Sequence, residues 1–290
     1  MTISEGRITA NDVDFGYLET GSGPLALCLH GFPDSAWTWR HLLPALADAG
    51  FRAVAPFLRG YAPTAIPADG RFQTAALGLD ANALHQELGG DGDAVIVGHD
   101  WGAMATYIAA NHEPERWRRV VTMAVPPAGA VATGFLTYKQ LQRSWYMFFF
   151  QHGLADIVVG MNDLSFIDDL WADWSPGYDA AEDLPHVKDC LRDPANLAAA
   201  IGYYRATLGG VGVDPALDAV QNKGNEATTQ PTLYLHGRTD GCMGIEVAEG
   251  AGAFLTAPGS RMEIVDDAGH FLHVERPDHV NQLVVDFVTG

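Results

Sequence analysis

The sequence contains little cysteine, and its cysteines show no spacing that would build a site. The three cysteines, Cys28, Cys190 and Cys242, are an odd number and lie far apart. A disulfide framework needs paired cysteines, and a zinc site needs cysteines or histidines at short, regular spacings. The sequence therefore predicts neither a disulfide nor a metal site. Cys28 lies inside an apolar run and is expected to pack as a small hydrophobic residue.

Positive charge is also scarce. The chain has 17 Lys and Arg residues against 36 Asp and Glu residues, a formal net charge of −19 at pH 7. Because so acidic a surface repels polyanions, we expect neither nucleic acid nor anionic lipid as a partner, and a highly anionic substrate is disfavoured. The simplest role of this charge is to keep the protein soluble.

Long apolar runs are missing as well. No stretch of the sequence approaches the roughly 20 apolar residues that a membrane-spanning helix needs. The first residues, "MTISEGRITANDV", lack the basic and apolar regions of a signal peptide. We therefore expect no membrane association and a cytoplasmic location.

What the sequence does contain is an alternation of strand-like and helix-like segments. With 290 residues, 48% of them hydrophobic, the chain fits one large domain or one domain with an insertion. Runs that are apolar on both faces, such as "PLALCLHG" and "DAVIVGHD", are typical of strands buried in a parallel sheet. Helical patterns follow these runs, so the predicted fold class is α/β, with a mostly parallel central sheet flanked by helices.

The individual elements can be placed along the chain. Residues 5–20 predict a hairpin with its turn at Asn11 and Asp12. Leu77, Ala81, Leu84 and Leu88 fall on one face of a helix. Further strands are expected at 51–60, 117–127, 231–237 and 260–267, and a final helix around 280–287.

One region breaks the alternation. Residues 128–222 are rich in aromatic residues and helical patterns and show no clear strand. This region is expected to be a helical cap inserted between two strands. The predicted domains are therefore a core made of residues 1–127 and 223–290 and a cap made of residues 128–222.

The stretch "VIVGHDWGAMATY", residues 95–107, is the most informative motif. A buried strand ends in Gly98, Asp100 follows, and Gly102 opens a helix. Two glycines around a central residue allow the sharp strand-to-helix turn known as a nucleophile elbow, G-x-Nuc-x-G. In an open α/β sheet such a turn projects its central side chain into the ligand cleft. Asp100 is therefore a candidate nucleophile, although an Asp that merely caps a helix would show the same pattern.

Three other motifs support the catalytic interpretation. In "LHGFPDSAW" the backbone N–H of Phe32 can reach the site, and with the N–H of Trp101 it would form a two-donor oxyanion hole. In "DDAGHFLHVERPDHV", His270 follows a strand and has the place of a general base. In "LYLHGRTDGC", Asp240 lies at the end of the preceding strand. Each alone could be a turn or a cap, but together they predict a triad of Asp100, Asp240 and His270.

These motifs resemble those of a known family. "HGFPD", "FLRGYAPT", "VGHDWG", "LHGRTD" and "DAGHFLHVERP" are similar, in order and spacing, to those of the α/β-hydrolase-fold epoxide hydrolases. The resemblance covers both parts of the predicted core and implies an α/β-hydrolase fold with an inserted helical cap. It implies a cofactor-independent hydrolase that opens small hydrophobic epoxides with water.

The cap carries the residues that would distinguish this activity. In epoxide hydrolases two cap tyrosines donate protons to the epoxide oxygen. The strings "SWYMFFFQ" and "IGYYRAT" resemble the two tyrosine motifs and point to Tyr146 and Tyr204. Haloalkane dehalogenases share the Asp nucleophile and the "HDWG" string, but their usual Asn after His-Gly is Phe32 here. A cap tryptophan such as Trp145 or Trp174 could replace it, so dehalogenation remains the alternative.

Several further expectations complete the sequence-based picture. A ligand-binding α/β-hydrolase without turnover is a third alternative, disfavoured because a pure binder needs neither a triad nor two tyrosines. No cofactor or metal is expected, and whether the chain forms a homo-oligomer is left open. An apolar substrate pocket is expected to be lined by aromatic side chains, namely Phe32, Trp37, Trp101, Trp145 and Phe148.

Overall fold

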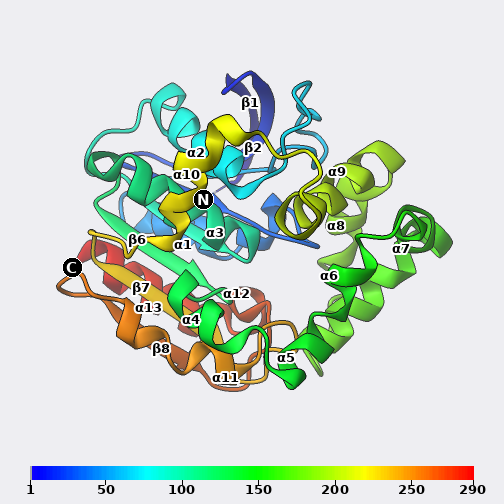
Figure 1. Ribbon diagram of the computed structural model, residues 1–290. Helices are drawn as coiled ribbons and strands as arrows, with labels where there is room; N and C mark the ends of the chain where they lie inside the picture. The colour runs from blue at the N-terminus through cyan, green and yellow to red at the C-terminus, as the bar shows by residue number, and fades with distance from the viewer. Residues whose placement is uncertain (1) are drawn as a thin grey trace.

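The computed structural model describes residues 2–290. In that range the chain forms an eight-stranded sheet with helices on both faces (Figure 1). The strands are β1 (Ser4–Ala10), β2 (Val13–Gly21), β3 (Leu25–Leu29), β4 (Arg52–Pro56), β5 (Val95–His99), β6 (Arg119–Met123), β7 (Thr232–Gly237) and β8 (Arg261–Val265).

The sheet is mostly parallel, as the apolar strands predict. Its order is β1-β2-β4-β3-β5-β6-β7-β8, with antiparallel pairing only where β2 meets β1 and β4. The other neighbours, from β4 to β8, pair in parallel. The carboxyl ends of β5, β7 and β8 therefore lie at one edge of the sheet, where ligands bind in such folds.

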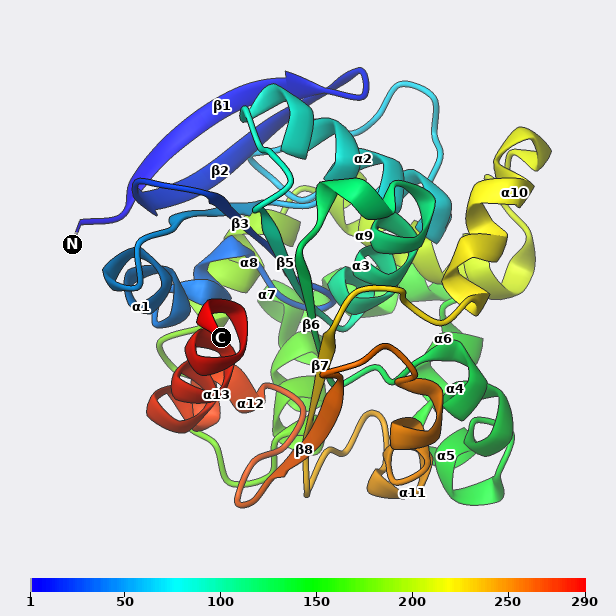
Figure 2. The same ribbon diagram turned by 90° about the vertical axis from the view of Figure 1, so that its left-hand side faces the viewer.

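Helices cover the sheet on both faces, which explains why its central strands are apolar throughout. Figure 2 shows α1 (Leu42–Asp48) and α13 (Pro277–Thr289) on one face, and α2 (Thr74–Glu87) and α3 (Trp101–His112) on the other. The predicted apolar face of α2 is buried. The shorter helices of the core are η1 (Ala36–Trp39), η2 (Pro114–Arg116), α11 (Ile245–Ala248), η6 (Ala251–Phe254) and α12 (Leu272–Glu275).

Helices and loops fill the chain between β6 and β7, and α6 to α9 gather at one side of the molecule (Figure 1). Helices α4 and α10, near the two ends of this insertion, contact core helices α11 and α2 respectively. Boundaries of a separate cap at residues 128 and 222 remain a prediction. The elements of the insertion are α4 (Ala128–Gly134), α5 (Tyr138–Arg143), α6 (Trp145–Phe149), α7 (Leu154–Trp174), α8 (Leu184–Leu191), α9 (Pro194–Tyr204), η3 (Arg205–Gly209), η4 (Pro215–Leu217), α10 (Asp218–Gln221) and η5 (Asn222–Asn225).

Two predicted strands end earlier than the sequence pattern suggests. The strand expected at 51–60 ends at Pro56, because the Leu58 N–H donates to Nε2 of His30 at 3.0 Å and not to a neighbouring strand. Burial lowers the pKa of His30 to about 4, so its ring stays neutral and can accept this bond. The strand expected at 117–127 ends at Met123, because Ala124 turns the chain with φ of 66°. Within residues 2–290 no helix combines the length and the apolarity that crossing a bilayer requires.

A buried ion pair fixes the loop after β4, and that loop holds the cap. The Arg59 guanidinium donates from Nε and Nη2 to the two carboxylate oxygens of Asp80 on α2, both at 2.6 Å. The backbone of the same loop is tied to α9: the Tyr203 hydroxyl donates to the carbonyl of Arg59, and the Asn196 amide to that of Gly60, both at 2.7 Å. The loop therefore links the sheet to the helix that carries Tyr204.

We predict that Asp80→Ala lowers the free energy of unfolding by about 3–5 kcal/mol, because the buried Arg59 charge loses its close partner and keeps only the exposed Asp69, 3.8 Å away. Urea unfolding followed by circular dichroism would measure this loss. The double variant Arg59→Met/Asp80→Leu removes both charges and is expected to recover much of the loss. As a control, Asp93→Ala removes the exposed partner of Arg118 and should cost less than about 1 kcal/mol. Equal losses in the two single variants would contradict the assignment.

Candidate active site

Asp100 occupies a strained turn between β5 and α3. Its backbone has φ of 53° and ψ of −118°, a conformation that costs a non-glycine residue about 1–3 kcal/mol. The glycines on either side make the turn possible. A Cβ on Gly98 would lie 2.2 Å from the carbonyl oxygen of Gly102, and a Cβ on Gly102 would lie 2.1 Å from the carbonyl oxygen of Leu29. The predicted strand–turn–helix is therefore present, and it projects the carboxylate from the carboxyl end of the sheet.

The Asp100 carboxylate accepts a hydrogen bond from the backbone N–H of Phe32, at 2.8 Å from Oδ1. Burial raises the pKa of Asp100 above its ordinary value, while the nearby His270 and the N–H groups of Phe32 and Trp101 act in the opposite direction. The two N–H groups predicted to form an oxyanion hole thus both face the carboxyl group of Asp100. They can stabilise negative charge on the oxygen of this group that they face.

His270 lies between two carboxylates. Its Nδ1–H donates to Oδ2 of Asp240 at 3.0 Å, and its Nε2 faces Oδ2 of Asp100 at 3.8 Å. Nε2 has no hydrogen-bond partner among residues 2–290, so it is free to take a proton from a molecule beside Asp100. The three predicted residues come from the ends of β5, β7 and β8, and the sheet brings them together.

Asp240 is itself held by its own loop. Its Oδ1 accepts hydrogen bonds from the backbone N–H groups of Cys242 at 2.7 Å and Met243 at 2.8 Å, which leaves Oδ2 for the histidine. Burial alone would lower the pKa of His270, but the carboxylates of Asp240 and Asp100 outweigh it and raise that pKa above 6.5. Asp240 thus orients the ring and stabilises its protonated form.

Tyr146 on α6 and Tyr204 at the end of α9 line the same cavity as Asp100. Their rings lie edge to face, with centroids 5.5 Å apart. The Tyr146 hydroxyl lies 3.4 Å from the sulfur of Cys242, and the Tyr204 hydroxyl has no hydrogen-bond partner in the described chain. Burial raises the pKa of both phenols well above 10, so both keep their protons and can donate them.

The cavity measures about 180 Å³ and is mostly apolar. Asp100, Trp101 and the two tyrosines were predicted from the sequence as site residues, whereas most of the other residues that line the cavity were not. Cys242 and Met243 could have been found, because they lie two and three residues after Asp240. The walls that were missed include Met104, Val125, Val131, Met147, Cys242 and Met243.

Of the five residues predicted to line the pocket, Trp101 does so. The ring of Phe32 packs edge to face against Tyr204 and lies outside the lining, although its N–H reaches Asp100. Trp37 lies elsewhere and stacks on His186 of α8, with ring centroids 4.9 Å apart.

Trp145 and Phe148 also lie outside the lining, which corrects the prediction. Their side chains are 48% and 49% exposed. The cause is the helical period of α6: with about 100° between successive residues, Tyr146 and Met147 face the cavity and Trp145 and Phe148 cannot. A run of aromatic residues in the sequence does not show which of their side chains point into the cavity.

Among residues 2–290, two buried groups have side chains of the kinds that bind metals. They are Asp34 with His99 and His273, and Asp100 with Cys242 and His270. The second group is the candidate catalytic set itself. In the first, Asp34 Oδ2 lies 4.0 Å from His99 Nδ1, wider than the roughly 3.3 Å between ligand atoms around a tetrahedral zinc ion. The absence of a metal remains the expectation from the sequence.

Comparisons with known proteins agree with this geometry. The α/β-hydrolase fold family matches residues 24–154. Epoxide hydrolase A of Mycobacterium tuberculosis is 28% identical over 316 residues, covering 99% of this chain and 98% of that protein. Human epoxide hydrolase 4 is 29% identical over 293 residues, covering 97% of this chain and 77% of that protein.

Solved structures extend the similarity to three dimensions. The crystal structure of epoxide hydrolase A from Mycobacterium thermoresistibile superposes with a TM-score of 0.82 at 27% identity, covering 100% of this chain and 99% of that one. The sheet order, the elbow after β5 and the helical insertion after β6 fit this similarity. The chain therefore has the α/β-hydrolase fold.

Proposed function

We propose that this protein is an epoxide hydrolase that converts epoxides to vicinal diols through a covalent ester on Asp100. The observation that carries the proposal is one cavity that combines the buried carboxylate of Asp100 with the side chains of two tyrosines. A carboxylate can attack carbon without a base, and the tyrosines supply the acid that opening an epoxide ring requires. The similar epoxide hydrolases support the same activity.

In the first half-reaction an oxygen of Asp100 forms a bond to one epoxide carbon. The bond between that carbon and the ring oxygen breaks, and the electron pair goes to the oxygen, which takes a proton from Tyr146 or Tyr204. The products are an alkyl ester of Asp100 and a tyrosinate. Because both phenols have strongly raised pKa values, they hold their protons until the ring oxygen becomes basic.

In the second half-reaction His270 takes a proton from water, and the resulting hydroxide attacks the carboxyl carbon of Asp100. The N–H groups of Phe32 and Trp101 stabilise the oxyanion that forms. When the ester bond breaks, the alkoxide takes the proton from His270, and the diol leaves. The proton that remains on the Asp100 carboxyl passes to the tyrosinate, which restores the starting state.

One observation favours a second candidate function. The indole Nε1–H of Trp101 is buried, has no hydrogen-bond partner within residues 2–290, and belongs to a residue that lines the cavity. Such a donor could stabilise a departing halide, so haloalkane dehalogenation is the alternative. Diol release from styrene oxide, measured beside halide release from 1-bromobutane, separates the two. Halide release without diol release would overturn the epoxide hydrolase proposal.

We predict that Tyr146→Phe and Tyr204→Phe each slow ester formation by roughly tenfold or more, about 1.4 kcal/mol of barrier. The double variant should have almost no epoxide activity, because the described cavity then lacks an acid for the oxygen. Stopped-flow tryptophan fluorescence would follow ester formation. Tyr138→Phe, a change at an exposed tyrosine of α5, serves as the control and should behave like the parent. A double variant that opens styrene oxide at the parental rate would disprove the roles of these tyrosines.

We predict that His270→Gln accumulates the covalent ester, because attack by Asp100 needs no base whereas hydrolysis does. After incubation with styrene oxide, mass spectrometry should find one added substrate mass on the peptide that contains Asp100. The matched control Asp100→Asn/His270→Gln lacks the nucleophile and should gain no mass. Absence of the adduct in His270→Gln would argue for direct attack by water.

We predict that the rate of ester hydrolysis falls as the pH is lowered, with an apparent pKa above the ordinary histidine value of about 6.5. Only neutral His270 can accept the proton of water. In the ester Asp100 carries no charge, but Asp240, the larger of the two influences that raise the pKa of His270, still does, so the neutral form appears at higher pH. In Asp240→Asn the main cause of the rise is lost and burial dominates. The apparent pKa of ester hydrolysis should then move to lower pH, while the rate of ester hydrolysis falls by about a hundredfold or more. Single-turnover decay of the ester across pH measures both effects, and an unmoved apparent pKa would contradict the role of Asp240.

A further inference from the structure

Residues 269–271, which we call the base loop, carry His270 into the site, and side chains bind two of their backbone N–H groups. The N–H of Gly269 donates to Oε2 of Glu275 at 2.8 Å, and the N–H of Phe271 donates to the hydroxyl of Ser175 at 3.1 Å. That hydroxyl in turn donates to the other carboxylate oxygen of Glu275, Oε1, at 2.6 Å. Glu275 ends α12, and Ser175 directly follows α7. One carboxylate and one hydroxyl therefore join the base loop to the helical insertion.

The backbone at the end of α7 binds the third N–H group of the base loop. The carbonyl oxygen of Trp174 accepts from the N–H of His270 and from the N–H of Gly241, next to Asp240, both at 3.0 Å. Such a carbonyl is available because the last carbonyls of a helix have no partner within it. The fit is close, since a Cβ on Gly241 would lie 2.0 Å from the carbonyl oxygen of Asp173. The end of α7 thus holds the loops of both His270 and Asp240.

Side chains in the last turn of α7 contact the same surroundings. The ring of Trp174 lies between those of His270 and Tyr146, with centroids 5.0 Å and 4.9 Å away. The indole N–H of Trp171 donates to the carbonyl of Pro33 at 2.8 Å, in the loop of the predicted oxyanion hole. The last turn of α7 therefore contacts each part of the proposed machinery that surrounds Asp100.

The position of the base loop decides where Nε2 of His270 lies, because Asp240 fixes the opposite side of the ring. In the proposed chemistry water must lie within hydrogen-bond reach of Nε2 and close to the carboxyl carbon of Asp100. A misplacement of about 1 Å can slow such a step by about a hundredfold. Ester formation needs no base, so it does not depend on this position.

We propose that Ser175 and Glu275 are positioning residues for His270, which fix the base loop against the end of α7 and so set the rate of ester hydrolysis and not that of ester formation. The inference rests on the proposed epoxide hydrolase activity. Hydrogen bonds carry the effect, not the charge of Glu275. A glutamine at this position can keep both contacts, because its Oε1 can accept from Gly269 and its amide can donate to the Ser175 hydroxyl.

The experiment compares Ser175→Ala, Glu275→Ala and Glu275→Gln with the parent, with styrene oxide as the substrate. Stopped-flow fluorescence measures ester formation, and single-turnover decay measures ester hydrolysis. In the two alanine variants we expect ester hydrolysis to slow about tenfold or more, and ester formation to stay within about twofold of the parental rate. Glu275→Gln should hydrolyse the ester at nearly the parental rate. Equal slowing in Glu275→Gln and Glu275→Ala would assign the effect to charge and overturn the positioning role.

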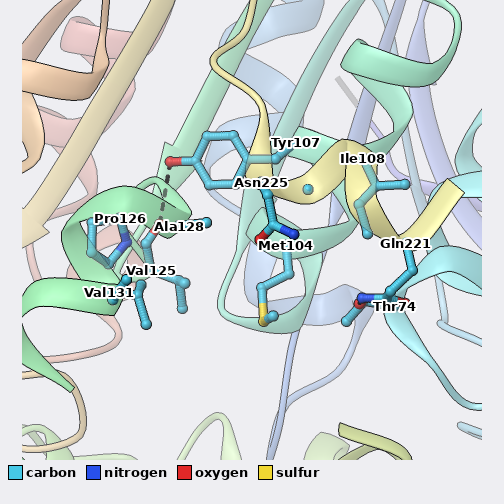
Figure 3. A pocket seen from close by; sticks show the side chains of 12 residues that line it. Thr74, Met104, Tyr107, Ile108, Val125, Pro126, Ala128, Val131, Gln221 and Asn225 are labelled. Atoms are coloured by element: carbon cyan, nitrogen blue, oxygen red, sulfur yellow. Dashed lines mark hydrogen bonds between the residues drawn. The ribbon is translucent and has the colours of Figure 1, made fainter. Parts of the chain in front are cut away.

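The matched control is Tyr107→Phe, which also removes one hydroxyl from a buried side chain of the core. Tyr107 on α3 lines another cavity, of about 290 Å³, where Figure 3 shows its hydroxyl directed toward the chain at Val125. That hydroxyl lies 2.8 Å from Oγ1 of Thr122 and donates to the carbonyl of Val125 at 3.3 Å. Tyr107→Phe should change neither half-reaction. If it slowed ester hydrolysis as much as Ser175→Ala does, the effect would not belong to the base loop and the inference would fail.

Amide hydrogen exchange keeps the inference separate from turnover. Mass spectrometry of the peptide that contains residues 269–271 should show about tenfold faster exchange in Ser175→Ala and Glu275→Ala, and parental exchange in Glu275→Gln and Tyr107→Phe. This result supports the positioning of His270 even if styrene oxide is not hydrolysed, in which case only the proposed activity fails. Parental exchange in both alanine variants overturns the inference. Faster exchange together with parental ester hydrolysis also overturns it, because the contacts would then hold the loop without serving the reaction.

Discussion

The backbone of Asp100 is the constraint on which the site depends. A non-glycine residue at φ of 53° is held there because Gly98 lies near the end of β5, α3 begins at once, and the backbone of β3 passes close by. The same crowding places the Phe32 N–H 2.8 Å from the carboxylate. Relaxing the turn would both free Asp100 and remove its donors, so strain and binding are parts of one arrangement.

Around that turn the protein balances buried charge. Asp100, Asp240 and His270 are all buried, and burial disfavours the charged forms of Asp100 and His270. The backbone N–H groups of Phe32 and Trp101 oppose this effect at Asp100, and the two carboxylates reverse it at His270. The outcome is a histidine with a raised pKa beside a nucleophile, an arrangement that suits proton transfer at the ester stage.

The sequence predicts those features of the structure that depend on residues close together in the chain. Strands buried on both faces, the elbow at Asp100 and the order of the motifs are local signals, and the strands, helices and topology of the structure agree with them. The residues lining the pocket depend on which way each cap helix faces, and no local rule supplies that. Trp145 and Phe148 lie on the side of α6 that faces away from the cavity, and the lining residues Val131 and Phe135 belong to no motif. The sequence also showed no sign of the Arg59–Asp80 ion pair, because its two residues lie 21 positions apart in the chain.

The short loop from Asp240 to Met243 joins the two halves of the proposed chemistry. Its backbone N–H groups hold the carboxylate that orients His270, and the sulfur of Cys242 lies against the hydroxyl of Tyr146. A substitution in this loop therefore reaches the acid of ring opening and the base of ester hydrolysis together. Mutations here are expected to be epistatic with changes at either residue, since groups that share partners do not contribute independently. Evolution toward a new substrate can vary the walls around Met104 one residue at a time, whereas changes in this loop succeed only in combination.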